Sequence, residues 1–280
     1  RTGEVVGTTF PPPPGPPPPK HDPAPLEVLR QMPEGEVRLA RELTVVFNQP
    51  MIALTSQDQA TTTTPVKLSP QPAGQWRWVD PRTVQFRPDG RFPQATKYTV
   101  EIPAGTKSVE GTPLHEAVSF TFETPSLRLE ASYPSGFGTK VTSVPIVHLF
   151  DQAIDPALLM PNVTVTANEE VLSMRVLTEA ELAEAAKSDR ELARFLEGPN
   201  KAGHRSRLLA LRPERDFPKQ ASITTRISPG ARSAEGPGLT KSWITSGFRT
   251  LAPLRFLQDG CSGVCAPEDS YSLNFNNVLD

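Results

Sequence analysis

The feature that most constrains this chain is an internal repeat. Residues 86–114 align without a gap on residues 211–239. A partial third copy is indicated near the end, because Leu26 to Asn48 reappears as Leu254 to Asn276. Copies separated by more than about 100 residues are typical of whole domains rather than of short solenoid units. The identical positions of the first two copies are Arg87/Arg212, Pro88/Pro213, Phe92/Phe217, Pro93/Pro218, Thr99/Thr224, Ile102/Ile227, Gly105/Gly230, Ser108/Ser233, Glu110/Glu235, Gly111/Gly236 and Leu114/Leu239.

The first copy has the pattern of short strands separated by turns. Apolar side chains alternate with polar ones around Val45 and around Trp78, so each strand has one apolar face. Proline and glycine between these segments, as in Pro88 to Gly90, predict turns. Short strands at this spacing favour an antiparallel sandwich, and we predict an Ig-like domain over residues 25–125. Its predicted structural core contains Val45, Phe47, Trp76, Trp78, Phe86, Tyr98 and Phe120.

The second copy predicts a second sandwich over residues 126–252 with one helical insertion. The helix is expected at about residues 178–197, opened by a capping-box pattern and closed by the breaker pair Gly198-Pro199. Its thin apolar stripe is expected to pack on the sandwich, with a partner contact as the alternative; the stripe consists of Leu182, Ala186, Ala193 and Leu196.

Residues 253–280 are expected to begin a truncated third Ig-like domain. The predicted fold class is therefore all-β, with tandem Ig-like antiparallel β-sandwich domains and one helical insertion in the second.

The first 24 residues predict a tether. Two runs of four prolines, Pro11 to Pro14 and Pro16 to Pro19, flank a single glycine. Proline lacks a backbone N–H and fixes φ, so this segment is expected to be extended polyproline II or disordered. A spacer is the favoured interpretation, and a docking peptide for an aromatic-lined groove is the alternative.

Signatures of enzymes and of nucleic-acid binding are missing from the sequence. The net charge is −2, which gives no basic surface for nucleic acid, and no apolar run of about 18 residues occurs. The four histidines lack metal-ligand spacing, and no hydrolase or phosphate-binding motif occurs. We therefore predict no catalytic, cofactor-binding or metal-binding residues and no cofactor.

Three smaller features have plain structural interpretations. His148 shares its parity with Ile146 and Phe150, which predicts a core-facing structural histidine rather than a ligand or a pH sensor. Glu110 and Glu235 recur in loops without a second acid, which favours a turn-shaping or surface role over catalysis. The segment from Gly136 to Gly138 is expected to be a turn.

Cys261 and Cys265 are the only cysteines of the chain. Three intervening residues with a glycine permit a small disulfide ring, whereas a zinc site would need two further ligands. We predict a disulfide, which would indicate an oxidising compartment and hence an exported protein.

Several segments carry a resemblance to a known family. The first copy contains Phe47-Asn-Gln-Pro-Met51, Gly74-Gln-Trp-Arg-Trp78 and Thr83-Val-Gln-Phe-Arg-Pro88, and the second contains Phe150-Asp-Gln and Ser233-Ala-Glu-Gly-Pro237. These segments resemble the N-terminal macroglobulin modules of bacterial alpha-2-macroglobulins. The resemblance covers Pro25 to Asp280.

The resemblance implies a non-catalytic scaffold within a protease-trapping inhibitor. In that family a bait segment is cut and the molecule closes around the protease, and many members add a thioester from a Cys-x-Glu-Gln motif, which this sequence lacks. The implied partners are the remaining domains of the full-length chain and, through them, proteases. The implied location is periplasmic or at the cell surface, with membrane tethering through an N-terminal lipid outside this sequence. The alternatives are an Ig-like adhesion or carbohydrate-binding array and accessory modules of a secreted hydrolase.

Overall fold

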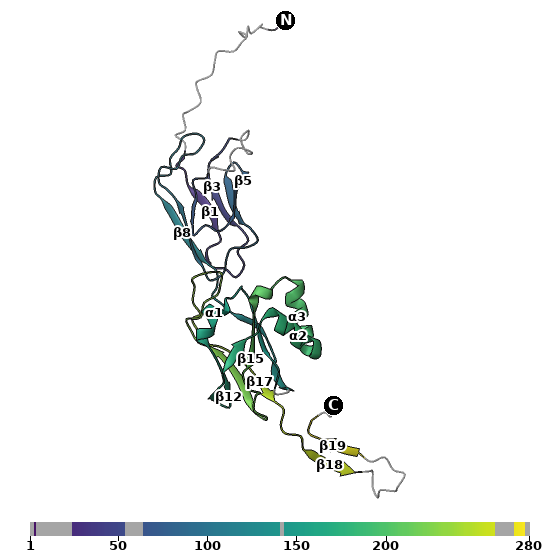
Figure 1. The fold of residues 1–280 in the computed structure, drawn as a ribbon. Coiled ribbons are helices and arrows are strands. Elements are labelled where there is room, and N and C mark those ends of the chain that lie inside the picture. Colours follow the sequence, from purple (N-terminus) through teal and green to yellow (C-terminus); the bar gives the residue numbers. More distant parts are fainter. Residues whose placement is uncertain (1–2, 4–23, 54–63, 141–142, 261–271, 278–280) are drawn as a thin grey trace.

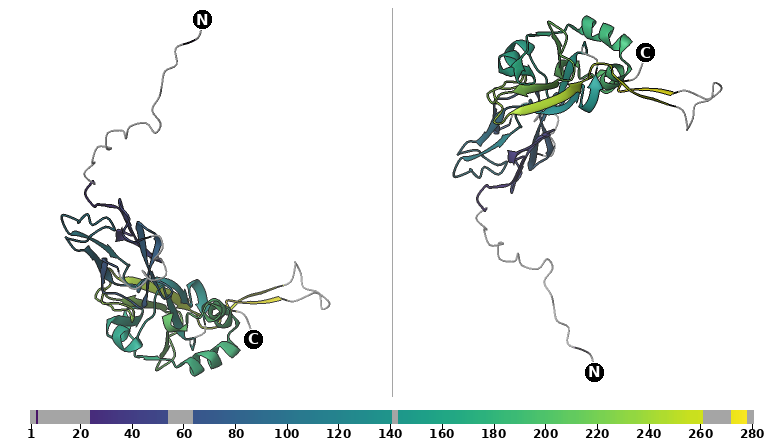
Figure 2. Two further views of the ribbon diagram at one scale, coloured as in Figure 1. Left: turned by 90° about the horizontal axis from the view of Figure 1, so that it is seen from above. Right: turned by 90° about the horizontal axis from the view of Figure 1, so that it is seen from below.

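Two β-sandwiches follow each other along the chain, and a two-stranded hairpin projects beyond the second (Figure 1). The computed structural model describes residues 3, 24–53, 64–140, 143–260 and 272–277. The predicted tether lies almost wholly outside these residues. Two further views show the same order, with the hairpin pointing away from both sandwiches (Figure 2).

The first sandwich consists of two four-stranded sheets. One sheet has the order β1-β3-β6-β5 and the other the order β2-β8-β7-β4. All neighbours are antiparallel except the edge pair β2 and β8, which is parallel. The strands are β1 (Val28–Met32), β2 (Gly35–Glu36), β3 (Leu43–Phe47), β4 (Lys67–Ser69), β5 (Gly74–Asp80), β6 (Thr83–Pro88), β7 (Lys97–Ile102) and β8 (Val118–Glu123).

The core of the first sandwich follows from the alternation in its strands. Burial alternates along β3 and β7, because successive side chains of a strand point to opposite faces. Phe92 sits at the centre of an aromatic cluster and contacts Tyr98 and Phe122 edge-on, at ring distances of 5.0 and 5.2 Å. Of the core residues named from the sequence, those in the structural core are Val45, Phe47, Trp78, Phe86, Tyr98 and Phe120.

Trp76 differs from this set because it is only half-buried. It packs against Phe86 at a ring distance of 5.1 Å, and its indole N–H donates to Gln71 Oε1 at 3.2 Å. β5 is an edge strand, so part of this side chain stays in contact with solvent. Strand parity identified the face of Trp76 but not its depth.

The second sandwich repeats the arrangement with a five-stranded and a four-stranded sheet. Their orders are β10-β17-β16-β12-β13 and β14-β15-β11-β9. The strands are β9 (Leu129–Tyr133), β10 (Gly136–Lys140), β11 (Ile146–Phe150), β12 (Val163–Ala167), β13 (Glu170–Val171), β14 (Met174–Val176), β15 (Leu208–Pro213), β16 (Ser222–Ile227) and β17 (Ile244–Thr250).

The prediction of a turn at Gly136 to Gly138 was wrong. These residues belong to β10, which pairs in parallel with β17 and aligns Gly136 with Phe248. Glycine is a poor local signal for a strand, and the pairing comes from a partner strand more than a hundred residues away in the sequence. The two-residue strand β2 likewise depends on a distant partner strand, β8.

The predicted single helix is a pair of helices. α2 (Glu179–Ser188) begins at the expected capping box, in which Thr178 and Glu181 exchange hydrogen bonds. Asp189 then leaves the helical conformation and caps α3 (Arg190–Lys201) by accepting from the N–H groups of Glu191 and Leu192. An aspartate is a strong N-cap, so it starts a new helix where a continuous one was predicted.

The end of the insertion also differs from the prediction. The breaker pair Gly198-Pro199 does not end α3, since Pro199 lies inside the helix and is buried. Leu192 and Leu196 pack on the outer face of β11 and β15 with Val147 and Ala210, so the insertion covers a sheet. A further short helix, α1 (Pro156–Leu159), follows Asp155 as its N-cap.

The C-terminal part forms the hairpin of β18 (Phe256–Gly260) and β19 (Ser272–Phe275). Phe256 pairs with Phe275 in an antiparallel register. Cys261 and Cys265 lie outside the described residues, so their disulfide stays a prediction.

Candidate functional site at the joint between the sandwiches

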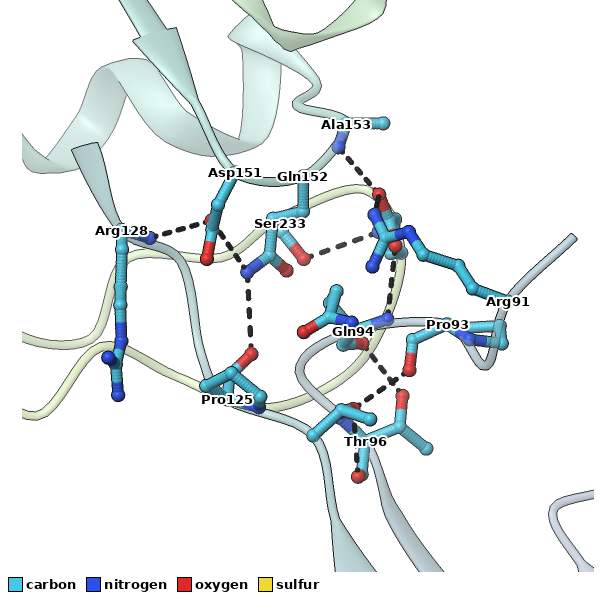
Figure 3. Close-up of polar contacts among 12 residues, drawn as sticks. Arg91, Pro93, Gln94, Thr96, Pro125, Arg128, Asp151, Gln152, Ala153 and Ser233 are labelled. Carbon is cyan, nitrogen blue, oxygen red and sulfur yellow. Dashed lines mark hydrogen bonds and ion pairs between the residues drawn. The ribbon is translucent and has the colours of Figure 1, made fainter. Parts of the chain in front are cut away.

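The two sandwiches meet at a polar contact between two loops. We call the segment Ser233–Gly238 of the second sandwich the joint loop, and the segment Arg91–Thr96 of the first sandwich the receiving loop. Figure 3 shows residues of both loops converging with the linker around Pro125 and with the segment Asp151 to Ala153. The contact is called the joint below.

Glu235 is the centre of the joint. Its Oε1 atom accepts from Arg91 Nη2 at 2.8 Å and from the N–H of Ala153 at 2.7 Å, while Oε2 accepts from the N–H of Gln94 at 3.0 Å. The side chains of Arg91 and Glu235 are 22% and 18% exposed, so the ion pair is largely shielded from water. Charge-assisted hydrogen bonds are about twice as strong as neutral ones. The carboxylate of Glu235 therefore binds two residues of the first sandwich, Arg91 and Gln94, and also the backbone of Ala153 in its own sandwich.

Two glycines bring the backbones of the joint into contact. A Cβ atom at Gly236 would lie under 3.0 Å from atoms of Gln94, Ala95 and Thr96. The N–H of Gly238 donates to the carbonyl of Ala95 at 2.6 Å. Only glycine permits this approach, because any side chain at position 236 would overlap the receiving loop.

A second layer of polar contacts surrounds Glu235. Gln152 donates through Nε2 to the carbonyl of Pro125 at 3.4 Å and to Asp151 Oδ1 at 3.1 Å. Arg128 pairs with Glu36 at 3.1 Å, but both side chains are about half exposed. Exposed ion pairs contribute little, so the shielded contacts of Glu235 dominate the joint.

The polar groups of the joint bind one another. The Glu235 carboxylate, the Arg91 guanidinium and two backbone N–H groups pair in these contacts. Among residues 24–53, 64–140, 143–260 and 272–277, no group of three His, Cys, Asp or Glu side chains could hold a metal ion. Among the same residues, no helix is long and apolar enough to cross a membrane.

His148 lies where its parity placed it, between the two sheets of the second sandwich. It is buried, and its Nε2 atom is 2.8 Å from Ser246 Oγ in the opposite sheet. Burial lowers its pKa from 6.5 to about 4, because the charged form would lose its hydration. The imidazole is therefore neutral at pH 7.

The repeat did not indicate the role of Glu235, because Glu110 occupies the same position of the first copy. In the structure Glu110 is exposed, whereas Glu235 is partly buried. The signal that could have separated them is the second glycine, Gly238, which stands where the first copy has Pro113. A glycine that is added to one copy of a repeat points to a close backbone approach in that copy.

Comparisons with known proteins agree with this architecture. The model of the bacterial Ig-like domain matches residues 22–124. An alpha-2-macroglobulin homolog from Nostoc sp. is 26% identical over 274 residues, an alignment that covers 88% of this chain. The chain is related to the alpha-2-macroglobulins. Its two sandwiches form a macroglobulin-like scaffold.

The alignment covers only 14% of the length of the Nostoc macroglobulin homolog. Among solved structures, native alpha-2-macroglobulin from Escherichia coli is 13% identical and has a TM-score of 0.26, with 83% of this chain and 73% of that chain covered. An L,D-transpeptidase from Mycobacterium tuberculosis is 18% identical and has a TM-score of 0.24, with 55% and 59% covered. TM-scores this low do not establish a shared overall arrangement.

Proposed function

We propose that this chain is a non-catalytic arm of an exported, bacterial protease-trapping macroglobulin. The observation that carries the proposal is the relationship to a macroglobulin homolog along nearly the whole chain, although the chain spans a small part of that protein. A trap that closes around a protease needs parts that keep their shape while others move. Two sandwiches fixed to each other by a shielded carboxylate and a glycine contact suit such a part.

The proposed location is the periplasm or the cell surface. The proline-rich start supports a spacer between a membrane anchor and the first sandwich, and the predicted disulfide supports an oxidising compartment. Membrane fractionation of the full-length protein tests the anchor, and recovery wholly in the soluble fraction would contradict it.

Protease inhibition tests the function. The full-length protein should block cleavage of a large protein substrate by a broad-specificity protease at a stoichiometric ratio. Residues 1–280 alone are the matched control and should not inhibit. A full-length protein without inhibition would contradict the trap, whereas stoichiometric inhibition by residues 1–280 would contradict the assignment of this segment as scaffold.

A further inference from the structure

The far end of the second sandwich repeats the receiving loop of the first. Asp216–Ala221 aligns on Arg91–Thr96 in the internal repeat, and we call it the distal loop. Gln220 has a positive φ of 57°, as its counterpart Ala95 has a φ of 53°. Each loop is tied to the strand end behind it in the same way, through Thr124 to Pro93 O at 2.8 Å and through Thr250 to Pro218 O at 2.6 Å.

The two loops differ in what covers them. In the receiving loop Ala95 is 1% exposed, because the joint loop lies on it. Its counterpart Gln220 is exposed, and so are Asp216 and Lys219. The distal loop therefore has the backbone geometry of a joint surface without a joint loop on it among the described residues.

The hairpin that follows the distal loop opens like the two sandwiches before it. Phe256 pairs with Phe275 as Val28 pairs with Phe47, and both pairings have an irregularity directly afterwards. The side chain of Asn276 accepts from the N–H of Arg255 at 2.6 Å and donates to the carbonyl of Pro253 at 2.9 Å.

The equivalent contacts in the first sandwich involve the same atoms. Asn48 accepts from the N–H of Glu27 at 2.9 Å and donates to the carbonyl of Pro25 at 2.8 Å. In the second sandwich, Asp151 accepts from the N–H of Arg128 at 3.0 Å. Three antiparallel strand pairs that share this contact indicate three modules of one kind.

Within the described residues, the third strand pair lacks the neighbours that flank the first two. β3 pairs with β6 on its other edge and β11 pairs with β15, whereas β19 pairs with β18 alone. Leu273 is 57% exposed, while its counterpart Val45 in β3 is fully buried. An open edge with exposed apolar residues is a template for a further strand.

We propose that a later segment of the same polypeptide completes a third sandwich on β19, and that a loop of this sandwich docks on the distal loop to form a second joint. The occupant is inferred from continuity with the first joint. The docking loop donates a backbone N–H to the carbonyl of Gln220 and has a glycine opposite residues 219–221, as Gly236 and Gly238 do in the first joint. This inference does not depend on protease trapping.

The polarity of the second joint is opposite to that of the first. Asp216 stands where the receiving loop has Arg91, the partner of Glu235. A carboxylate in the docking loop would face a like charge and be repelled. The residue in the position of Glu235 is therefore a hydrogen-bond donor, and a lysine or arginine fits best.

Amide hydrogen exchange tests the second joint. Residues 1–280 are compared with the complete gene product that contains them, over a series of protein concentrations. We expect the amides of β19 and the distal loop to be at least about tenfold more protected in the complete protein. The amides of β3, β11 and the receiving loop are the matched controls and should not change. Unchanged exchange of β19 and the distal loop overturns the proposal, and so does protection in residues 1–280 that rises with concentration, because a second copy would then occupy the edge.

A charge reversal tests the polarity. Asp216→Lys in the complete protein should remove the added protection of the distal loop while β19 stays protected. Glu214→Lys is the matched control, because Glu214 is an exposed acid two residues earlier with no counterpart in the joint. Protection that survives Asp216→Lys overturns the proposed donor opposite Asp216.

Discussion

The two sandwiches share one strand arrangement, but equivalent positions have different roles. Glu110 and Glu235 occupy the same place in the repeat, yet Glu110 is exposed, whereas Glu235 accepts from two donors across the joint and from the N–H of Ala153 in its own sandwich. The second sandwich meets a neighbour at this loop, whereas the first presents its copy at the opposite end. The repeat therefore specifies the module, and the neighbouring domain determines what a repeated residue does.

The interiors also differ at matched positions. β3 and β11 are equivalent, so the buried Val45 corresponds to the buried His148. Phe86 and Leu211 are equivalent in the repeat. Trp76 pairs with Phe86 and Val176 pairs with Leu211, so Val176 is the counterpart of Trp76. Two residues later, Thr178, the N-cap of α2, is the counterpart of Trp78. A core tryptophan in one copy is thus replaced by the start of a helical cover in the other.

Trp78→Ala gives the largest expected effect. The side chain is 8% exposed and contacts Phe47 at a ring distance of 6.4 Å. Truncation leaves a cavity and should lower the free energy of unfolding by about 3–5 kcal/mol, measured by chemical denaturation. Trp243→Ala is the control, because Trp243 is 61% exposed, and it should change stability by less than about 0.5 kcal/mol. Equal losses in the two variants would contradict the assigned core.

His148 should make the stability of the second sandwich depend on pH. Its counterpart in the first sandwich, Val45, does not titrate and has no such effect. Its pKa is about 4 when folded and 6.5 when unfolded, so the unfolded state binds the proton first as the pH falls. Stability is therefore complete above pH 6.5 and should decline by about 3 kcal/mol as the pH falls to 4.

Unfolding of wild type and His148→Val over this pH range measures the effect. The variant carries the residue of the first sandwich and should lose this part of the pH dependence, while His115→Ala, at an exposed site, should retain it. A wild-type slope in His148→Val would show that another group titrates.

Gly236→Ala should open the joint. The added methyl group overlaps the backbone of the receiving loop, which should destabilise the closed contact by about 1–3 kcal/mol. Small-angle scattering should detect a change in the mean arrangement of the two sandwiches. Gly111→Ala is the matched control, since a Cβ atom there meets nothing within 4 Å and only local backbone strain is expected. An unchanged scattering profile for Gly236→Ala would argue against the close contact.

Glu235→Ala should weaken the joint by about 1–2 kcal/mol, because three donors lose their acceptor in a partly shielded site. The N–H of Gly238 donates across the joint, so its exchange rate should rise about 5- to 30-fold. Glu110→Ala changes the matched residue and should leave this rate unaltered. Equal effects of the two variants would remove the distinction between the copies.

The positions of many strands and of the first inserted helix could be predicted from local sequence patterns. The alternation around Val45 placed β3, and the capping box placed the start of α2, because both signals depend on neighbours in the sequence. The strand at Gly136 could not be predicted in this way, and the local signal at Asp189 was ambiguous, because the surrounding residues also fit a continuous helix. Asp189 competes with a continuous helix as a cap, and β10 depends on pairing with β17.

The candidate site was hidden for a related reason. The repeat made Glu235 look like Glu110, since both carboxylates stand before a glycine in similar loops. The repeated module and its sandwich class could be predicted from the amino-acid sequence, because periodic apolar positions and turn residues act locally. The resemblance to macroglobulin modules came from matching segments of sequence. The role of one of the two carboxylates in joining the sandwiches follows from the three-dimensional fold, because it depends on which backbone N–H groups lie within about 3 Å of that carboxylate.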